Sequence, residues 1–327
     1  MPSVLIGAGA IRGCEGRFRE ILTSAGFECL DPPGDHLLDD AEVREWLPQA
    51  SALIAGSEVI SPSILDAAPH LRVVARVGVG YDAIDVAAAS ARKVLVAITP
   101  GANHDSVAEH AFALLLAITR GVAFKDRALR AGVWDRTVVL PLRGKVLGLI
   151  GFGRIGSAMV ARANAFGMPV IAHDPFADVE LFKRLGVERV ELDELIERAD
   201  VVSLHAPMTP ETSRMINAER LNRMRPRGIL INTARGGLID QKALYEALKA
   251  GKIEAAGLDV LDPEPPDFKD PLIQLPNVVI TAHVAGIDEQ ALADMAQKAA
   301  ECVVELYMGR MPIDCIVNRE ITSGWTW

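Results

Sequence analysis

Three side chains that together suit carbonyl and proton chemistry follow successive apolar runs in the second half of the chain. Arg235 lies in NTARGG, Glu264 in LDVLDPEPP and His283 in TAHVAG. An Arg guanidinium grips a carboxylate with two parallel hydrogen bonds and polarises a neighbouring carbonyl. A His beside a carboxylate is held in one tautomer and suits a general acid that protonates a carbonyl oxygen as hydride arrives. The set predicts the reduction of a 2-oxo acid, or the reverse oxidation.

The elements that must position these residues form two series of short apolar runs, which alternate with helical patterns as in parallel sheets covered by helices. The five candidate strands of the first series are Val4 to Gly7, Phe27 to Leu30, Ala52 to Ala55, Arg72 to Ala75 and Val94 to Ala97. The six of the second series are Val146 to Ile150, Pro169 to His173, Val201 to Leu204, Gly228 to Asn232, Ala255 to Leu258 and Val278 to Thr281.

Arg235, Glu264 and His283 come after strands four, five and six of the second series. Ligands of open α/β sheets bind outside the carboxyl ends of the strands, so these side chains should share one face. Taken singly, each has an ordinary alternative: a surface ion pair for Arg235, a turn carboxylate between prolines for Glu264 and a helix cap for His283. Their joint occurrence beside a cofactor turn favours the catalytic interpretation.

The segment TPGANHDSVAEH separates the two series. Its Pro-Gly pair breaks the chain, and Ser106 followed by Glu109 matches a capping box at the start of an apolar helix. The chain after about residue 288 is helical and adds no full βα unit. We therefore expect two doubly wound parallel-sheet domains: a cofactor domain at 100–287 and a discontinuous, flavodoxin-like substrate (lid) domain built from 1–99 plus 288–327.

Each series opens with a glycine-rich turn, GAGAIR from Gly7 and GFGRIG from Gly151 to Gly156. A Rossmann dinucleotide turn uses its third glycine for close packing of helix on strand. That position is Gly156 in the second turn but Arg12 in the first, where the longer side chain would not fit. The second turn is therefore the predicted NAD site, and the first is expected to be a surface βα turn.

An acidic residue that can bind the adenosine ribose follows each turn, Asp31 after the first and Asp174 after the second. This test does not separate the two turns. Asp174 predicts NAD rather than NADP, because its carboxylate would repel a 2′-phosphate and the PFADVEL segment after it holds no Arg or Lys.

Composition excludes several other classes of protein. The chain is 50% hydrophobic and 24% charged, as in folded globular proteins. A net charge of −9 without a basic run argues against nucleic acid or a membrane surface as a partner. The four cysteines lack CxxC or zinc spacing, so no metal is expected and we expect reduced thiols in a cytoplasmic protein. Signal-peptide and membrane-span patterns are also lacking.

Seven motifs spread over nearly the whole chain resemble the D-isomer-specific 2-hydroxyacid dehydrogenase family, which includes D-3-phosphoglycerate dehydrogenase, glyoxylate/hydroxypyruvate reductase and D-lactate dehydrogenase. They are VGVGYDAID (Val77 to Asp85), NHDSVAEH (Asn103 to His110), GFGRIG with HDP, LHAPMTPET (Leu204 to Thr212), NTARGGLID (Asn232 to Asp240), GLDVLDPEP (Gly257 to Pro265) and TAHVAG. One departure is Ala282, where the family usually has a proline before its catalytic His.

The resemblance implies that His283 is the acid/base, that Glu264 pairs with it and that Arg235 orients the substrate. The implied cofactor residues are Gly151, Gly153, Arg154, Ile155, Gly156, Asp174, His205, Pro207, Thr212, Thr233, Asp259 and His283. The implied substrate residues are Arg76, Val79, Gly80, Asn103 and Arg235. A homodimer through the cofactor domain is also implied.

The substrate and the physiological direction stay open at this point. A phosphoglycerate dehydrogenase-like and a glyoxylate/hydroxypyruvate reductase-like enzyme both fit. Arg76, Arg92 and Arg12 would suit an anionic distal group such as phosphate, or are ordinary charges of the lid. A formate dehydrogenase would normally place Gln where Glu264 stands. The alternative from another class is an NAD(H)-sensing protein, like the corepressors built on the same fold.

Overall fold

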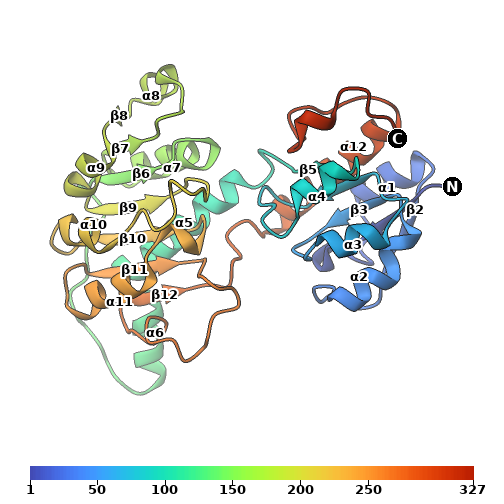
Figure 1. Cartoon of the computed structure of the whole chain (residues 1–327). Helices are drawn as coiled ribbons and strands as arrows, with labels where there is room; N and C mark the ends of the chain where they lie inside the picture. The colour runs from blue at the N-terminus through green and yellow to red at the C-terminus, as the bar shows by residue number, and fades with distance from the viewer. The chain divides into compact units, whose positions relative to one another are not determined.

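The computed structural model describes residues 1–327 and divides into two compact units (Figure 1). Unit 1 comprises Met1–Asn103 and Ile287–Trp327, and unit 2 comprises His104–Gly286. The chain therefore leaves unit 1 once and returns to it at the end. The sequence pattern predicted these two domain boundaries after residues 99 and 287.

Unit 1 is built on a five-stranded sheet in the order β2-β1-β3-β4-β5, in which every pairing is parallel. Its strands are β1 (Ser3–Ile6), β2 (Glu28–Leu30), β3 (Ala52–Ala55), β4 (Val73–Arg76) and β5 (Leu95–Ala97). Its helices are α1 (Arg17–Ser24), α2 (Asp40–Trp46), α3 (Pro62–Ala67), α4 (Val86–Ala91) and α12 (Glu289–Tyr307), with short 3-10 turns η1 (Gly9–Ile11), η2 (Leu47–Gln49) and η4 (Arg319–Ile321).

Both faces of strands β1, β3, β4 and β5 are largely buried, which explains why these strands are mainly apolar rather than alternating. Val4 and Ile6 of β1 pack with α1 and α12 on one face, whereas Leu5 packs with α2, α3 and α4 on the other. Because the side chains of a strand alternate between faces, one short strand contributes to both cores. The C-terminal helix α12 therefore supplies much of one core of the unit in which the chain begins.

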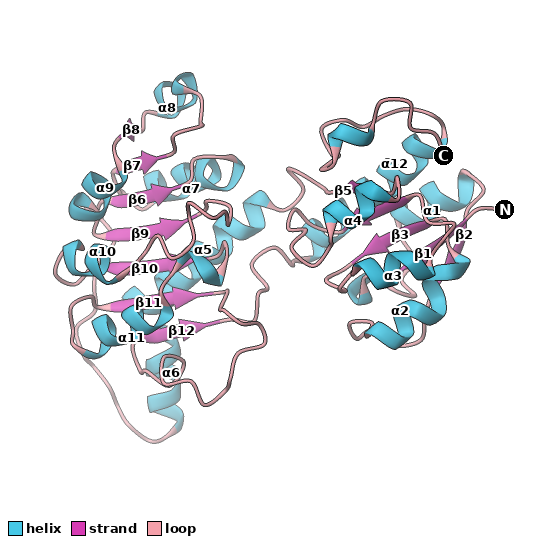
Figure 2. Ribbon diagram, viewed as in Figure 1, coloured by secondary structure: helices cyan, strands magenta, loops and turns pink.

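Unit 2 contains a seven-stranded sheet in the order β12-β11-β10-β9-β6-β7-β8, again with parallel pairings only (Figure 2). Its strands are β6 (Leu147–Ile150), β7 (Val170–His173), β8 (Glu188–Arg189), β9 (Val201–Leu204), β10 (Ile229–Asn232), β11 (Ala255–Leu258) and β12 (Val278–Ile280). The two predicted doubly wound sheets are confirmed. The strand order reverses at β6, and ligands of such sheets bind at the carboxyl ends of the strands that flank this point, here β6 and β9.

Helices cover both faces of this second sheet (Figure 2). The helices of unit 2 are α5 (His104–Arg120), α6 (Val122–Arg130), α7 (Arg154–Ala165), α8 (Val179–Leu185), α9 (Leu192–Arg198), α10 (Ala218–Arg223) and α11 (Gln241–Lys249), with a 3-10 turn η3 (Gly236–Leu238). The apolar side chains of α5, α7 and α8 form one core, and those of α9, α10 and α11 form the other. Helix α6 has no buried residue and belongs to neither core.

Two expectations about local structure are wrong. The second sheet has a seventh strand, β8, which the sequence pattern missed because only two exposed residues form it. The predicted capping box at Ser106 and Glu109 is not the helix start, because α5 begins at His104 and Ser106 lies within its first turn. Glu109 instead accepts a hydrogen bond from Arg162 of α7 at 2.9 Å.

None of the helices is by itself long and apolar enough to cross a membrane. Helices α5 and α6 reach that composition only as a pair, and they are bent by 54° at the break between them. The residues of α5 that give it this composition include Ala111, Phe112 and Leu115, which are buried in a core of unit 2.

Candidate active site

The three candidate catalytic residues lie beyond the carboxyl ends of three strands that are neighbours in the sheet of unit 2. Arg235 follows β10, Glu264 follows β11 and His283 follows β12, and the sheet places β10, β11 and β12 side by side. The parallel pairing brings their loops to the same edge. The sequence prediction that these residues share one face agrees with this placement.

His283 and Glu264 form a direct hydrogen bond. The Nδ1 atom of His283 lies 2.7 Å from Oε2 of Glu264, and the other oxygen, Oε1, accepts from the backbone N–H of Leu261 at 2.9 Å. Burial by itself would raise the pKa of Glu264, but the bonds from His283 and Leu261 outweigh it and hold that pKa below its usual value. Glu264 is therefore a carboxylate at neutral pH, and its charge orients the imidazole.

Arg235 completes this group from the loop after β10. Its charge is close enough to contribute to the lowered pKa of Glu264. The loop is shaped by Asn232, a fully buried side chain that donates to the Arg235 carbonyl at 2.8 Å and accepts from the Ala234 N–H at 3.0 Å. Gly236 allows the loop to touch its neighbour, since a Cβ there would overlap the Leu261 carbonyl. The loops after β10 and β11 thus pack directly together.

The turn that carries His283 is held by the buried carboxylate of Asp259, at the end of β11. Asp259 is 1% exposed, and its oxygens accept from the backbone N–H groups of Val284 at 2.9 Å and Ala285 at 2.8 Å. The N–H of His283 in turn donates to the Asp259 carbonyl at 2.7 Å. His283 has a φ of 55°, a conformation that side chains other than glycine seldom adopt, and these bonds hold it there.

Two further side chains complete the hydrogen bonds of Asp259. The Thr281 hydroxyl donates to Oδ1 at 2.5 Å, so its oxygen accepts from Nε2 of His110, which lies 2.8 Å away on α5. Burial would raise the pKa of Asp259, but the bonds from His110, Thr281 and the turn amides lower it to about 2. The carboxylate is therefore ionised throughout the physiological range.

Sequence reasoning did not single out three residues that support the site: Asn232, Gln241 and Thr281. Gln241, on α11, donates to the Asp262 carbonyl at 2.6 Å and accepts from the Asp262 N–H at 3.0 Å, and so fixes the loop that carries Glu264. Asn232 and Thr281 lie inside the motifs quoted above. The sequence did not reveal their hydrogen bonds, because these form only once the chain has folded. An open pocket of about 510 Å³ adjoins Glu264 and His283.

The second glycine turn has the geometry that a dinucleotide requires. Gly151 has a φ of 94°, and a Cβ there would overlap the backbone of His205; one at Gly156 would overlap the Gly151 carbonyl. A Cβ at Gly153 would meet nothing within 4 Å, so the middle glycine faces open space. Gly153 is also the N-cap of α7, without a side-chain cap. An open approach to a helix N-terminus suits a pyrophosphate.

Asp174 lies at the end of β7, beside this turn. Its carboxylate accepts from the backbone N–H of Phe152 in the glycine turn at 2.8 Å and from those of Phe176 and Ala177. The loops after β6 and β7 are thereby joined. Acceptor oxygens at this place fit the hydroxyls of an adenosine ribose.

Among the buried polar atoms of this unit without a hydrogen-bond partner in the protein are the Thr233 hydroxyl after β10 and Nδ1 of His205 after β9. Burial lowers the pKa of His205 to about 4, so its ring is neutral at pH 7 and can offer a donor or an acceptor. Unpaired buried polar atoms are costly, and a polar ligand would satisfy them. The Thr212 hydroxyl, by contrast, already donates to the Pro207 carbonyl at 2.8 Å.

The first glycine turn, in unit 1, has a different construction. Arg12 is 7% exposed, and its guanidinium donates to the carbonyls of Gly7 at 2.6 Å, His36 at 3.0 Å and Gly34 at 3.2 Å. No α-helix starts at this turn, since α1 begins only at Arg17. The expectation of a surface turn is therefore wrong for Arg12, whose side chain fills the turn.

The remaining candidates of unit 1 lie at the end of β4 and beyond β5. The Arg76 guanidinium lies over Gly78 and donates to the Val77 carbonyl. Val79 and Gly80 follow as partly buried residues, and Asn103 is 9% exposed. Two charged residues considered with them have local partners: Arg92 pairs with Asp66, and Asp31 pairs with Arg19 at 2.8 Å.

Comparison with known proteins identifies the family to which the chain belongs. Residues 112–285 match the family model described as the NAD binding domain of D-isomer specific 2-hydroxyacid dehydrogenases, which covers more than half of the chain. The chain belongs to this family.

Relatives of this dehydrogenase include a glyoxylate reductase of Korarchaeum cryptofilum, which is 43% identical over 273 residues, or 82% of each chain. A D-3-phosphoglycerate dehydrogenase of Archaeoglobus fulgidus is 40% identical over 279 residues, which are 84% of this chain but 53% of that protein. The chain thus spans about half the length of the phosphoglycerate dehydrogenase. The crystal structure of the TT0316 protein from Thermus thermophilus is 39% identical and superposes with a TM-score of 0.87, over 96% of this chain and 99% of that one.

The family makes the chain an NAD-dependent 2-hydroxyacid dehydrogenase, an oxidoreductase. NAD is its cofactor, and the open approach at Gly153 and the unpaired atoms of Thr233 and His205 fit such a ligand. Groups of His, Cys, Asp and Glu arranged to hold a metal ion are not found in the structure.

Asp259→Asn should lower the free energy of unfolding by about 2 kcal/mol at pH 7, because the amide cannot replace the charge to which these donors bind. The folded-state pKa of Asp259 lies below its unfolded value, so this stability is present above about pH 4 and is lost as pH falls towards 2. Urea unfolding of the wild type and the variant should therefore show a difference that shrinks between pH 5 and pH 3. The exposed Asp267→Asn is the matched control, and a pH-independent difference would contradict this account.

Proposed function

We propose that the protein transfers hydride reversibly between NADH and a small 2-oxo acid, with His283 as acid/base, Glu264 as its partner and Arg235 orienting the substrate. The observation that carries this proposal is the 2.7 Å hydrogen bond between Nδ1 of His283 and a Glu264 carboxylate whose pKa is lowered. This bond occupies one ring nitrogen and leaves Nε2 to exchange a proton with substrate.

In the reducing direction, Nε2–H of His283 gives its proton to the substrate carbonyl oxygen. Glu264 stays ionised, keeps the proton on Nδ1 and stabilises the imidazolium form that precedes the transfer. The Arg235 guanidinium binds the substrate carboxylate and polarises the adjacent carbonyl, while Asn232 fixes the backbone from which Arg235 extends. The bound cofactor supplies the hydride.

We propose that the turn of Gly151, Gly153 and Gly156 binds the pyrophosphate of the cofactor and that Asp174 binds its adenosine ribose. The other proposed contacts are Arg154, Ile155, His205, Pro207, Thr212, Thr233, Asp259 and His283. For Asp259, a cofactor contact adds to the structural bonds already described, because an ionised carboxylate accepts more bonds than these.

The substrate proposed first is a small 2-oxo acid without a phosphate, such as glyoxylate or hydroxypyruvate. All three arginines considered for a distal phosphate already have partners in the protein: Arg12 binds backbone carbonyls, Arg92 pairs with Asp66, and Arg76 donates to the Val77 carbonyl and the Ser57 hydroxyl. Arg76, whose guanidinium lies over Gly78 and so next to Val79 and Gly80 in the chain, supports phosphohydroxypyruvate as the second candidate. The backbone amides around Val79 and Gly80 are proposed to receive the substrate carboxylate together with Arg235, and Asn103 is proposed to contact the substrate.

His283→Ala should lower kcat/KM for 2-oxo acid reduction by about 10³-fold, because general acid/base catalysis is lost. Initial rates with NADH and glyoxylate, hydroxypyruvate, phosphohydroxypyruvate or pyruvate provide the measurement, and wild type should prefer the first two. NADH fluorescence titration should show that the variant still binds cofactor. The exposed His70→Ala is the control. Full activity in His283→Ala would rule out the acid/base role, and a wild type that binds NADH but reduces no 2-oxo acid would favour an NAD(H) sensor.

Asp174→Asn should shift the cofactor preference towards NADPH by about tenfold, which corresponds to about 1.4 kcal/mol, because the charge that repels a 2′-phosphate is removed while an oxygen remains for the Phe152 N–H. The ratio of kcat/KM for NADH to that for NADPH is the measurement. Glu180→Ala, an exposed charge removal on the following helix, should leave the ratio unchanged. Equal use of the two cofactors by wild type would contradict the assignment of Asp174.

We also propose a homodimer through unit 2. Apolar side chains are exposed on α6 and the segment after it: Val122, Phe124, Leu129, Val133, Trp134 and Val138. Such a patch is typical of an interface between subunits. Phe124→Glu combined with Trp134→Glu should halve the molar mass measured by light scattering, whereas a wild type of monomer mass would contradict the dimer.

A further inference from the structure

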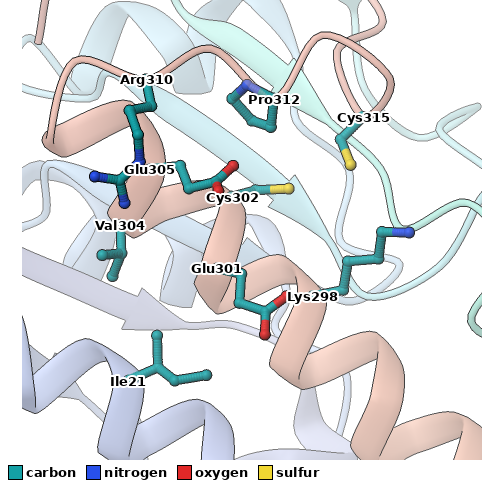
Figure 3. A pocket seen from close by; sticks show the side chains of 9 residues that line it. All are labelled: Ile21, Lys298, Glu301, Cys302, Val304, Glu305, Arg310, Pro312 and Cys315. Atoms are coloured by element: carbon teal, nitrogen blue, oxygen red, sulfur yellow. The ribbon is translucent and has the colours of Figure 1, made fainter.

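Two of the four cysteines lie together in unit 1, whereas the candidate catalytic residues belong to unit 2. Cys302 belongs to α12 and Cys315 to the tail after it, and both line one pocket of about 380 Å³ (Figure 3). Cys302 is 2% exposed and Cys315 is 6% exposed, so the protein surrounds both sulfur atoms except at the pocket. The pocket therefore gives small molecules a route to a pair of thiols that is otherwise buried.

The backbone holds each cysteine in place. The N–H of Cys315 donates to the Pro312 carbonyl at 2.9 Å, and its carbonyl accepts from the N–H of Ile98 at 2.9 Å. Cys302 lies on the face of α12 that packs in the core of unit 1, and that core also contains Cys315. Both thiols thus come from ordered, packed segments rather than from mobile loops.

The charges around the pair favour a reactive thiolate at Cys315. Interaction with the Cys302 thiol lowers the pKa of Cys315 and raises that of Cys302, and the Lys298 ammonium lowers the pKa of Cys315 further. Burial, Asp314 and Glu305 oppose this effect. The other charged groups lining the pocket are Glu301 and Arg310, and α1 contributes only the uncharged Ile21 (Figure 3). A thiolate beside a second thiol is the arrangement that thiol–disulfide exchange requires.

The other two cysteines lack this arrangement. Cys14 is exposed, and its sulfur has only the Ala10 carbonyl as a partner, at 4.0 Å. Cys29 is half-buried, and burial raises its pKa despite the nearby Arg19. They serve as internal controls for any reaction of Cys302 and Cys315.

We propose that Cys302 and Cys315 are a redox-active dithiol that a small disulfide oxidises reversibly to an intramolecular disulfide. The Cys315 thiolate attacks one sulfur of the oxidant RSSR, forms a mixed disulfide and releases RS⁻. Cys302, once deprotonated, attacks the Cys315 sulfur and releases the second RS⁻, so that two protein thiols and RSSR give one protein disulfide and two RSH. A dithiol compound reverses both steps.

The cross-link would join α12 to a tail that pairs with the edge of the sheet. Ile316 forms an antiparallel bridge with Ala97 of β5, and the N–H of Val317 donates to the Val96 carbonyl at 2.8 Å. Lys298, one turn before Cys302, donates to the Pro100 carbonyl at 2.6 Å, in the segment by which the chain leaves unit 1. Oxidation thus fixes the tail and the helix at the strand that precedes this exit.

The test uses the full chain, reduced and then incubated with oxidised glutathione under native conditions. Trypsin cleaves after Lys298, Arg310 and Arg319, so the two cysteines fall in separate peptides, 299–310 and 311–319. After free thiols are blocked, mass spectrometry without reductant should show these two peptides joined as the main disulfide species. Dithiothreitol should separate them.

Cysteine variants test whether the disulfide forms specifically between Cys302 and Cys315. The Cys14→Ser/Cys29→Ser double variant should form the same linked peptides to the same extent. Cys302→Ser should stop at the first step and carry glutathione on Cys315. The proposal is overturned if native protein gives only glutathione adducts at Cys14 or Cys29, or if the linked peptides form only after unfolding in urea.

Discussion

The geometry of the candidate site depends on one buried charge, the carboxylate of Asp259. Its two oxygens bind the turn that carries His283, and the Thr281 hydroxyl links it to His110 on α5. A charge in the protein interior is tolerated only where hydrogen bonds replace its hydration. The donors that Asp259 collects are therefore obligatory, and their arrangement holds His283 at a positive φ. Ala282, which stands where a proline is usual in the family, is compatible with this turn because hydrogen bonds rather than a ring hold its shape.

A second constraint is close contact between loops at the edge of the sheet. Gly236 lies against Leu261, and Gly151 lies against His205, at distances that exclude a side chain. These contacts bring the loops after β10 and β11, and those after β6 and β9, together as pairs. The candidate catalytic group and the second glycine turn thus share one feature: a glycine lets two loops at the strand ends pack directly together.

The sequence allowed the two sheets, the discontinuous unit and the positions of Arg235, Glu264 and His283 to be predicted, because each depends on apolar runs and on the rule that parallel strands end at one edge. It did not allow β8 to be found, since two exposed residues carry no apolar pattern. It also missed how the site is supported. His110 and Thr281 are 171 residues apart, and neither residue type by itself indicates the other.

Arg12 is a residue whose effect on the cofactor site could be predicted from the sequence, whereas its contacts could not. Its type and position were enough to reject the first glycine turn as a cofactor site. Its burial against three backbone carbonyls could not be predicted, because two of those carbonyls lie 22 and 24 residues further along the chain. The sequence therefore predicted that the first glycine turn does not bind the cofactor. The structure shows that the Arg12 side chain fills this turn.

The dependence of unit 1 on α12 has a consequence for protein synthesis. The ribosome completes all five strands of the first sheet about 190 residues before it makes α12, whose Met295, Ala299 and Val303 cover one face of that sheet. Translation proceeds at about 5 to 20 residues per second, so this apolar face has no cover for roughly 10 to 40 seconds. The nascent chain must pass through a stage in which unit 2 can fold to completion while the earlier unit waits for its last helix. Chaperone binding during that interval is consequently expected at the first sheet rather than at the cofactor-binding part of the chain.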